Sequence, residues 1–95
     1  MSIHVWFEQG TVWNLDPETH EGFRQMLRHA NEDVYITSGR EGDHHPASLH
    51  YLGRAWDMRH CGFTKAKLLS ALPGMDTVWD VVEYSWGFHV ERDPK

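Results

Sequence analysis

The chain has 95 residues, a net charge of −5 with histidine neutral, and a hydrophobic fraction of 40% that includes five tryptophans. This composition argues against a disordered chain and favours one small domain, residues 1–95, with a single core. A mildly acidic chain without a Lys/Arg cluster is a poor nucleic-acid binder, and no apolar run approaches the roughly 20 residues of a membrane span.

The N-terminal part of the chain is predicted to form a hairpin followed by a helix. Residues 3–8, "IHVWFE", are rich in β-formers, and residues 11–15, "TVWNL", are expected to pair with them as a short second strand. Asp16 is the predicted N-cap of a helix that has Pro17 at its first position and ends at Asn31. Apolar residues recur along this helix at the spacing i, i+3, i+4 and i+7, namely Phe23, Met26, Leu27 and Ala30.

The remaining segments are predicted to add four strands and a second helix. Strands are expected over 33–39, 54–58, 77–84 and 87–91, and a helix capped by Thr64 is expected to run to about residue 72. The order β(β)-α-β-β-α-β-β predicts an α+β fold, in which two helices cover one face of a small, mostly antiparallel sheet.

Several polar residues fall on or beside these strands. His50 comes just before the strand that contains Asp57, while Glu83 and His89 lie on the last hairpin. Such side chains cost free energy on the strands of a small domain unless a partner satisfies them. Zinc would satisfy two imidazoles and one carboxylate and would keep a position for water, with Glu83 as a general base. In the alternative, the domain is metal-free and its histidines are polar surface groups.

The sequence resembles the zinc D-alanyl-D-alanine peptidases, which share their fold with the hedgehog signalling domain. Residues 48–57, "SLHYLGRAWD", are similar to their Ser, His, Gly, Ala and Asp signature, and residues 44–59 are especially similar to the hedgehog version, which carries His-His before Ser-Leu-His-Tyr-x-Gly-Arg-Ala-x-Asp. Residues 81–91, "VVEYSWGFHVE", resemble the second half of the site, a Glu on a strand followed by a ligand His. Residues 36–40, "ITSGR", resemble the strand end that precedes the first motif.

The resemblance implies a metal site and a base. His50, Asp57 and His89 would be the zinc ligands, and Glu83 would take a proton from the zinc-bound water. If Glu83 points away, Glu91 is the alternative base, although it shares a face with His89 on simple alternation and is equally suited to hold that ligand in place.

The resemblance also implies substrate contacts. Arg40 would bind a substrate carboxylate or the developing oxyanion, and Ser48 would form a hydrogen bond near the substrate or a ligand. Independently of the resemblance, Trp86 lies in the turn beside the site and would either pack there or touch the substrate. One departure stands out, because many members have His-x-His where this chain has Gly87 and His89. His44, His45 and Trp86 are the candidates to replace the missing histidine.

The expected activity is that of a zinc metallopeptidase, of the D-Ala-D-Ala carboxypeptidase or L-Ala-D-Glu endopeptidase type, which hydrolyses peptidoglycan stem peptides or D-amino-acid dipeptides. The alternative is a catalytically inactive, zinc-containing binding module like hedgehog. The N-terminal sequence does not look like a signal peptide, so a monomer made in the cytoplasm is expected, for example a phage-encoded protein that acts on the cell wall. The single cysteine, Cys61, excludes an intramolecular disulfide.

Overall fold

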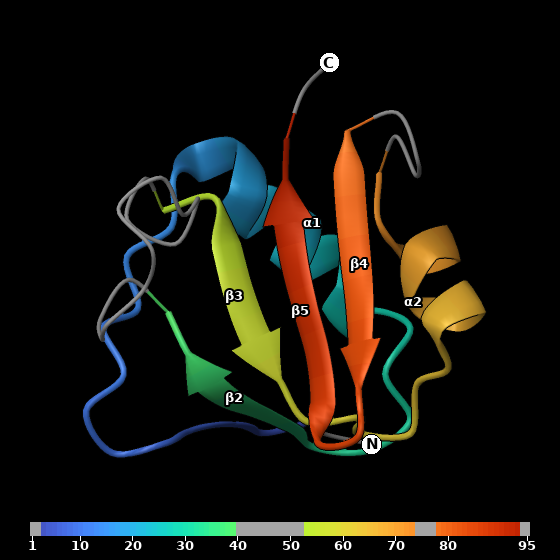
Figure 1. Cartoon of the computed structure of the whole chain (residues 1–95), viewed down its shortest axis with the longest axis horizontal. Helices are drawn as coiled ribbons and strands as arrows, with labels where there is room; N and C mark the ends of the chain where they lie inside the picture. Colours follow the sequence, from blue (N-terminus) through green and yellow to red (C-terminus); the bar gives the residue numbers. More distant parts are fainter. Residues whose placement is uncertain (1–2, 40–52, 74–77, 94–95) are drawn as a thin grey trace.

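The computed structural model describes residues 3–39, 53–73 and 78–93. The elements of these segments are, in chain order, β1 (Val5–Phe7), α1 (Pro17–Leu27), β2 (Val34–Ser38), β3 (Ala55–Met58), α2 (Lys65–Ala71), β4 (Trp79–Tyr84) and β5 (Gly87–Arg92). The strands form a sheet in the order β1-β2-β3-β5-β4, in which β1 and β2 are parallel and all other neighbours are antiparallel (Figure 1). The predicted α+β class, with two helices and a mostly antiparallel sheet, is therefore confirmed.

The predicted N-terminal hairpin is wrong. Residues 11–15 form no strand, and β1 pairs in parallel with β2, which lies far along the sequence. The Asp33 carboxylate supports this pairing, because it accepts hydrogen bonds from the His4 backbone N at 3.0 Å and from the Trp6 indole N at 3.1 Å. Residues 11–15 instead cross from the sheet edge to α1, and their two larger apolar side chains, Trp13 and Leu15, pack against the core.

Local sequence signals set the start of both helices as predicted. The Asp16 carboxylate accepts a hydrogen bond from the Thr19 backbone N at 2.8 Å, and the Thr64 hydroxyl accepts one from the Lys67 backbone N at 3.1 Å. α1 ends at Leu27, earlier than the predicted Asn31. The chain tightens there into i→i−3 bonds, such as that from the His29 backbone N to the Met26 carbonyl at 3.0 Å. Neither described helix has the length and hydropathy needed to cross a membrane.

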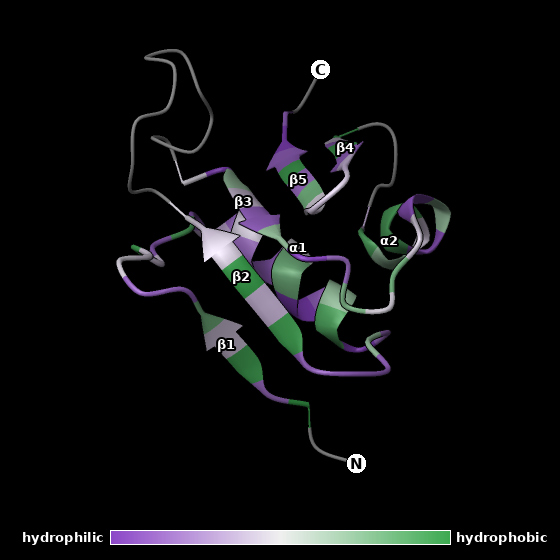
Figure 2. Ribbon diagram, turned by 60° about the horizontal axis from the view of Figure 1, so that its bottom comes forward, coloured by the Kyte–Doolittle hydropathy of each residue, from purple (hydrophilic) through white to green (hydrophobic). Residues whose placement is uncertain are grey.

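The two faces of the sheet differ in character. Both helices lie on one face (Figure 1), and hydrophobic residues alternate with more polar ones along β2 (Figure 2). On β3 and β5, every second side chain is buried in the core, including Trp56, Met58, Phe88 and Val90. The residues between them therefore point to the face that the helices leave open.

Asp16 also joins α1 to the end of β5. Its carboxylate accepts a hydrogen bond from the Arg92 guanidinium at 2.9 Å, and Arg92 also donates to the Thr19 hydroxyl at 3.1 Å. Burial would raise the pKa of Asp16, but the hydrogen bonds from Thr19 and Arg92 outweigh it and lower the pKa below the ordinary value.

We expect Asp16→Ala to lower the free energy of unfolding by about 2 kcal/mol at neutral pH, because it removes both the helix cap and a carboxylate partner of Arg92. Asp16 has a lowered pKa in the folded state, so its contribution is complete above about 3.8, the ordinary aspartate value, and is lost as the pH falls through the folded value. Urea unfolding at several pH values measures this difference. Glu18→Ala is the control, since Glu18 contacts Arg92 at 3.0 Å but is exposed. A difference that stays constant in acid would contradict the prediction.

Candidate functional site

The antiparallel pairing of β3 and β5 brings the described end of the first predicted motif next to the second motif. Asp57 lies directly opposite His89 in the register, and both side chains are on the open face of the sheet. The Asp57 Oδ1 and His89 Nδ1 atoms are 2.8 Å apart, and the two side chains are only 17% and 19% exposed. A carboxylate and an imidazole from distant parts of the sequence thus form one half-buried pair.

Glu91 holds the other side of the same imidazole. It follows His89 by two residues on β5, so it shares the open face, and its Oε1 lies 2.8 Å from His89 Nε2. Burial would lower the pKa of His89, but the hydrogen bonds to Asp57 and Glu91 raise it above the ordinary value. Both ring nitrogens of His89 therefore face carboxylate oxygens, and a metal bound to Nδ1 would take the place of the hydrogen bond between Nδ1 and Asp57.

Glu83 is not part of this group. On β4, Val82 is the residue that pairs with His89, whereas Glu83 pairs with Phe88, whose side chain is in the core. Glu83 therefore lies on the helix-covered side of the sheet, where its Oε2 is 3.4 Å from His60 Nε2. Glu83 is therefore not placed beside His89, and its role as general base, like the alternative role of Glu91, stays a prediction.

Three of the predicted site residues, Arg40, Ser48 and His50, lie outside the described residues, as do His44 and His45. Their roles as substrate-binding group, hydrogen-bonding group and third zinc ligand stay predictions.

A pocket of about 400 Å³ opens beside Asp57. Its described lining is Thr37, Ser38, Asp57, Arg59 and Trp86. Trp86 is 42% exposed and its ring stacks on that of Tyr84 with 5.2 Å between centroids. Trp86 thus both packs against Tyr84 and lines the pocket, so its two interpretations stay open.

Arg59 and the hydroxyl groups of the pocket were missed by the sequence analysis. A signal for Arg59 was present, because it follows Asp57 by two residues at the end of a strand, and this spacing places both side chains on one face. No comparable signal exists for Thr37 and Ser38, since their proximity depends on the pairing of β2 with β3.

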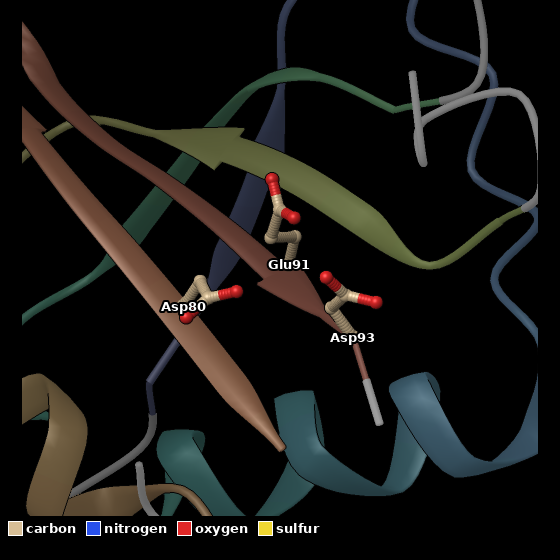
Figure 3. Close-up of side chains that lie close together, drawn as sticks. All are labelled: Asp80, Glu91 and Asp93. Atoms are coloured by element: carbon tan, nitrogen blue, oxygen red, sulfur yellow. The ribbon is translucent and has the colours of Figure 1, made fainter. Parts of the chain in front are cut away.

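Three carboxylates extend the negative charge along the open face. Asp80 lies opposite Glu91 in the β4–β5 register, and Asp93 follows the end of β5 (Figure 3). One oxygen of each residue lies within 4.8 Å of the others. Together with Asp57 they give this face an electrostatic attraction for cations.

The pair of Asp57 and His89 offers two of the donor types that zinc takes, one carboxylate oxygen and one imidazole nitrogen. The orientation of His89 is fixed by Glu91, as is usual for metal-binding histidines. These two donors fit part of a zinc site, and among the described residues no third His, Cys, Asp or Glu completes a set of three ligand atoms with this pair. No protein-family model, curated protein sequence or solved structure matches this chain.

Proposed function

We propose that the protein is a zinc metallopeptidase with the fold of the D-Ala-D-Ala peptidases and the hedgehog domain. Its substrates would be peptidoglycan stem peptides or dipeptides that contain D-amino acids, and a phage-encoded or bacterial monomer that acts on the cell wall is the proposed setting. The observation that carries the proposal is the 2.8 Å contact between Asp57 and His89, because these residues belong to the two separate motifs of the resemblance.

The proposed zinc ligands are His50, Asp57 and His89. Two histidines and one carboxylate leave a fourth position for water, and a bound zinc ion supplies a Lewis acid that lowers the pKa of that water and polarises a carbonyl group. Glu91 contacts His89 Nε2 and would orient the ring, and zinc bound to Nδ1 would take the place of the present hydrogen bond between Nδ1 and Asp57. Trp86 and Arg59 line the adjacent pocket, where the peptide would lie.

A second candidate, a zinc-containing binding module without turnover, is favoured by the position of Glu83. In the proposed peptidase this residue would receive the proton of the attacking water, yet its carboxylate lies next to His60 on the other side of the sheet. The two candidates share the zinc site and differ in activity. Hydrolysis of purified peptidoglycan fragments by the zinc-loaded protein, with Glu83→Gln as a comparison, distinguishes between them.

The first test is the zinc content of the untagged protein, measured by elemental mass spectrometry. We expect about one zinc per chain in the wild type and nearly none in His89→Ala, because two protein ligands rarely hold zinc where three are needed. His29→Ala is the matched control, since His29 is an exposed histidine that follows α1, and it should keep the wild-type content. A wild type that takes up no zinc from excess metal would overturn the proposed function.

A further inference from the structure

We propose that Arg59 binds a carboxylate of the substrate in the pocket beside Asp57. The preferred substrates would then be peptides with a free C-terminal carboxylate, so cleavage would occur at the chain end. This inference rests on the proposed function and adds a specificity-determining residue to it. It concerns a different arginine from Arg40, which comes before the first motif.

The position of Arg59 is fixed at two points. Its backbone N donates a hydrogen bond to the Tyr35 carbonyl at 3.0 Å, which extends the pairing of β2 and β3 past the end of β3. Its guanidinium lies over the Tyr35 ring, 5.2 Å from the centroid. A cation–π contact of this kind orients the planar group without using its N–H donors in ion pairs. The side chain is therefore held at the pocket with donors available to a ligand.

The charge of Arg59 is not neutralised within the described part of the chain. The guanidinium groups of Arg24, Arg54 and Arg92 lie 3.7, 3.4 and 2.9 Å from a carboxylate oxygen of Glu21, Asp16 and Asp16, respectively. Arg59 makes no such ion pair with a described residue, although the open face of the sheet carries several carboxylates. A positive group beside a pocket on an acidic face is suited to an anionic ligand, and a guanidinium binds a carboxylate through two parallel hydrogen bonds.

The other residues of the pocket agree with the end of a peptide chain as the ligand. Thr37 and Ser38 contribute hydroxyl groups, and Trp86 contributes an aromatic surface that a small apolar side chain can contact. Asp57 lies in the same pocket and would repel an anion, but its contact with His89 offsets part of that repulsion. A metal cation held by Asp57 would offset more, so the carboxylate should bind more tightly to the zinc-loaded protein than to the metal-free protein.

The test compares N-acetyl-D-Ala-D-Ala with its C-terminal amide. Calorimetric titration of the zinc-loaded wild type should show that the acid binds about 10- to 100-fold more tightly, which is the usual strength of hydrogen bonds to a charged group. Arg59→Gln should bind the two ligands equally, and Arg59→Lys should keep part of the preference. Arg28→Gln, an exposed arginine after α1, is the control and should behave as the wild type. Thermal unfolding of each variant checks that the fold is intact.

Equal binding of acid and amide by the wild type, binding of neither, or a preference that survives in Arg59→Gln would overturn the assignment. The outcomes for the proposed function are separate. Zinc-dependent hydrolysis of both ligands without preference would contradict the role of Arg59 but would support the proposed peptidase activity. If the protein binds no zinc but still prefers the acid through Arg59, the carboxylate site would be supported and the proposed peptidase activity would be contradicted.

Discussion

Glu91→Ala is expected to lower the affinity of the protein for zinc by about 10- to 100-fold, the usual effect of removing a group that holds a metal-binding histidine. Glu91 Oε1 lies 2.8 Å from His89 Nε2, so its loss removes one of the two carboxylates that orient the ring among the described residues. Glu91→Gln keeps an acceptor oxygen and should recover part of the affinity. Glu91→Leu keeps bulk but has no acceptor oxygen and should recover none of the affinity, whereas a loss of packing alone would be largely restored by either side chain.

Competition between the protein and a zinc-binding dye measures these affinities. Glu83→Ala is the matched control, because Glu83 is also a strand glutamate beside a histidine, His60, but lies on the opposite side of the sheet. It should leave zinc affinity unchanged. The reverse result, a loss with Glu83→Ala and none with Glu91→Ala, would show that the sequence resemblance places the functional glutamate better than the register of β4 and β5 does.

The parts of the fold that were predicted correctly depend on short stretches of sequence. Asp16 with Pro17, and Thr64 before α2, identify helix starts from neighbouring residues alone, since a cap bonds to a backbone N three residues away. Residues 11–15 have equally good strand composition but form no strand, because the partner of β1 is β2 and not the adjacent segment. Propensity describes one segment at a time and contains no information about which segment will pair with it.

The same distinction applies to the candidate site. Spacing along β5 predicts that Glu91 shares a face with His89, because both belong to one strand. Glu83 and His89 lie on different strands that are joined by a turn, so their relative positions depend on the register of that hairpin. In the observed register, the two turn residues Ser85 and Trp86 make Val82 the partner of His89, and Glu83 consequently points the other way. Alternation along a strand could be predicted, whereas the register across a turn needed the structure.

Gly87→Ala is expected to lower the free energy of unfolding by about 2–3 kcal/mol, and Gly87→His by more, because there is no room for a side chain at this position. A Cβ on Gly87 would overlap the Met58 carbonyl oxygen and would come within 2.8 Å of the Arg59 Cα. Both contacts are with the backbone at the end of β3, which cannot rotate away as a flexible side chain can. Urea unfolding of the metal-free protein measures the change.

Ser85→Ala is the control for Gly87, since Ser85 is exposed in the same turn and its loss should change the free energy of unfolding by less than about 0.5 kcal/mol. The prediction matters for function because Gly87 occupies the place of the first histidine in the His-x-His of the peptidases that the chain resembles. If Gly87→His folded with wild-type stability, the fold would tolerate a histidine at this position, and a single mutation would restore the His-x-His pattern. If it destabilises the fold as expected, the close approach of the β4–β5 turn to the end of β3 excludes that histidine, and any hydrolysis by this protein must proceed without it.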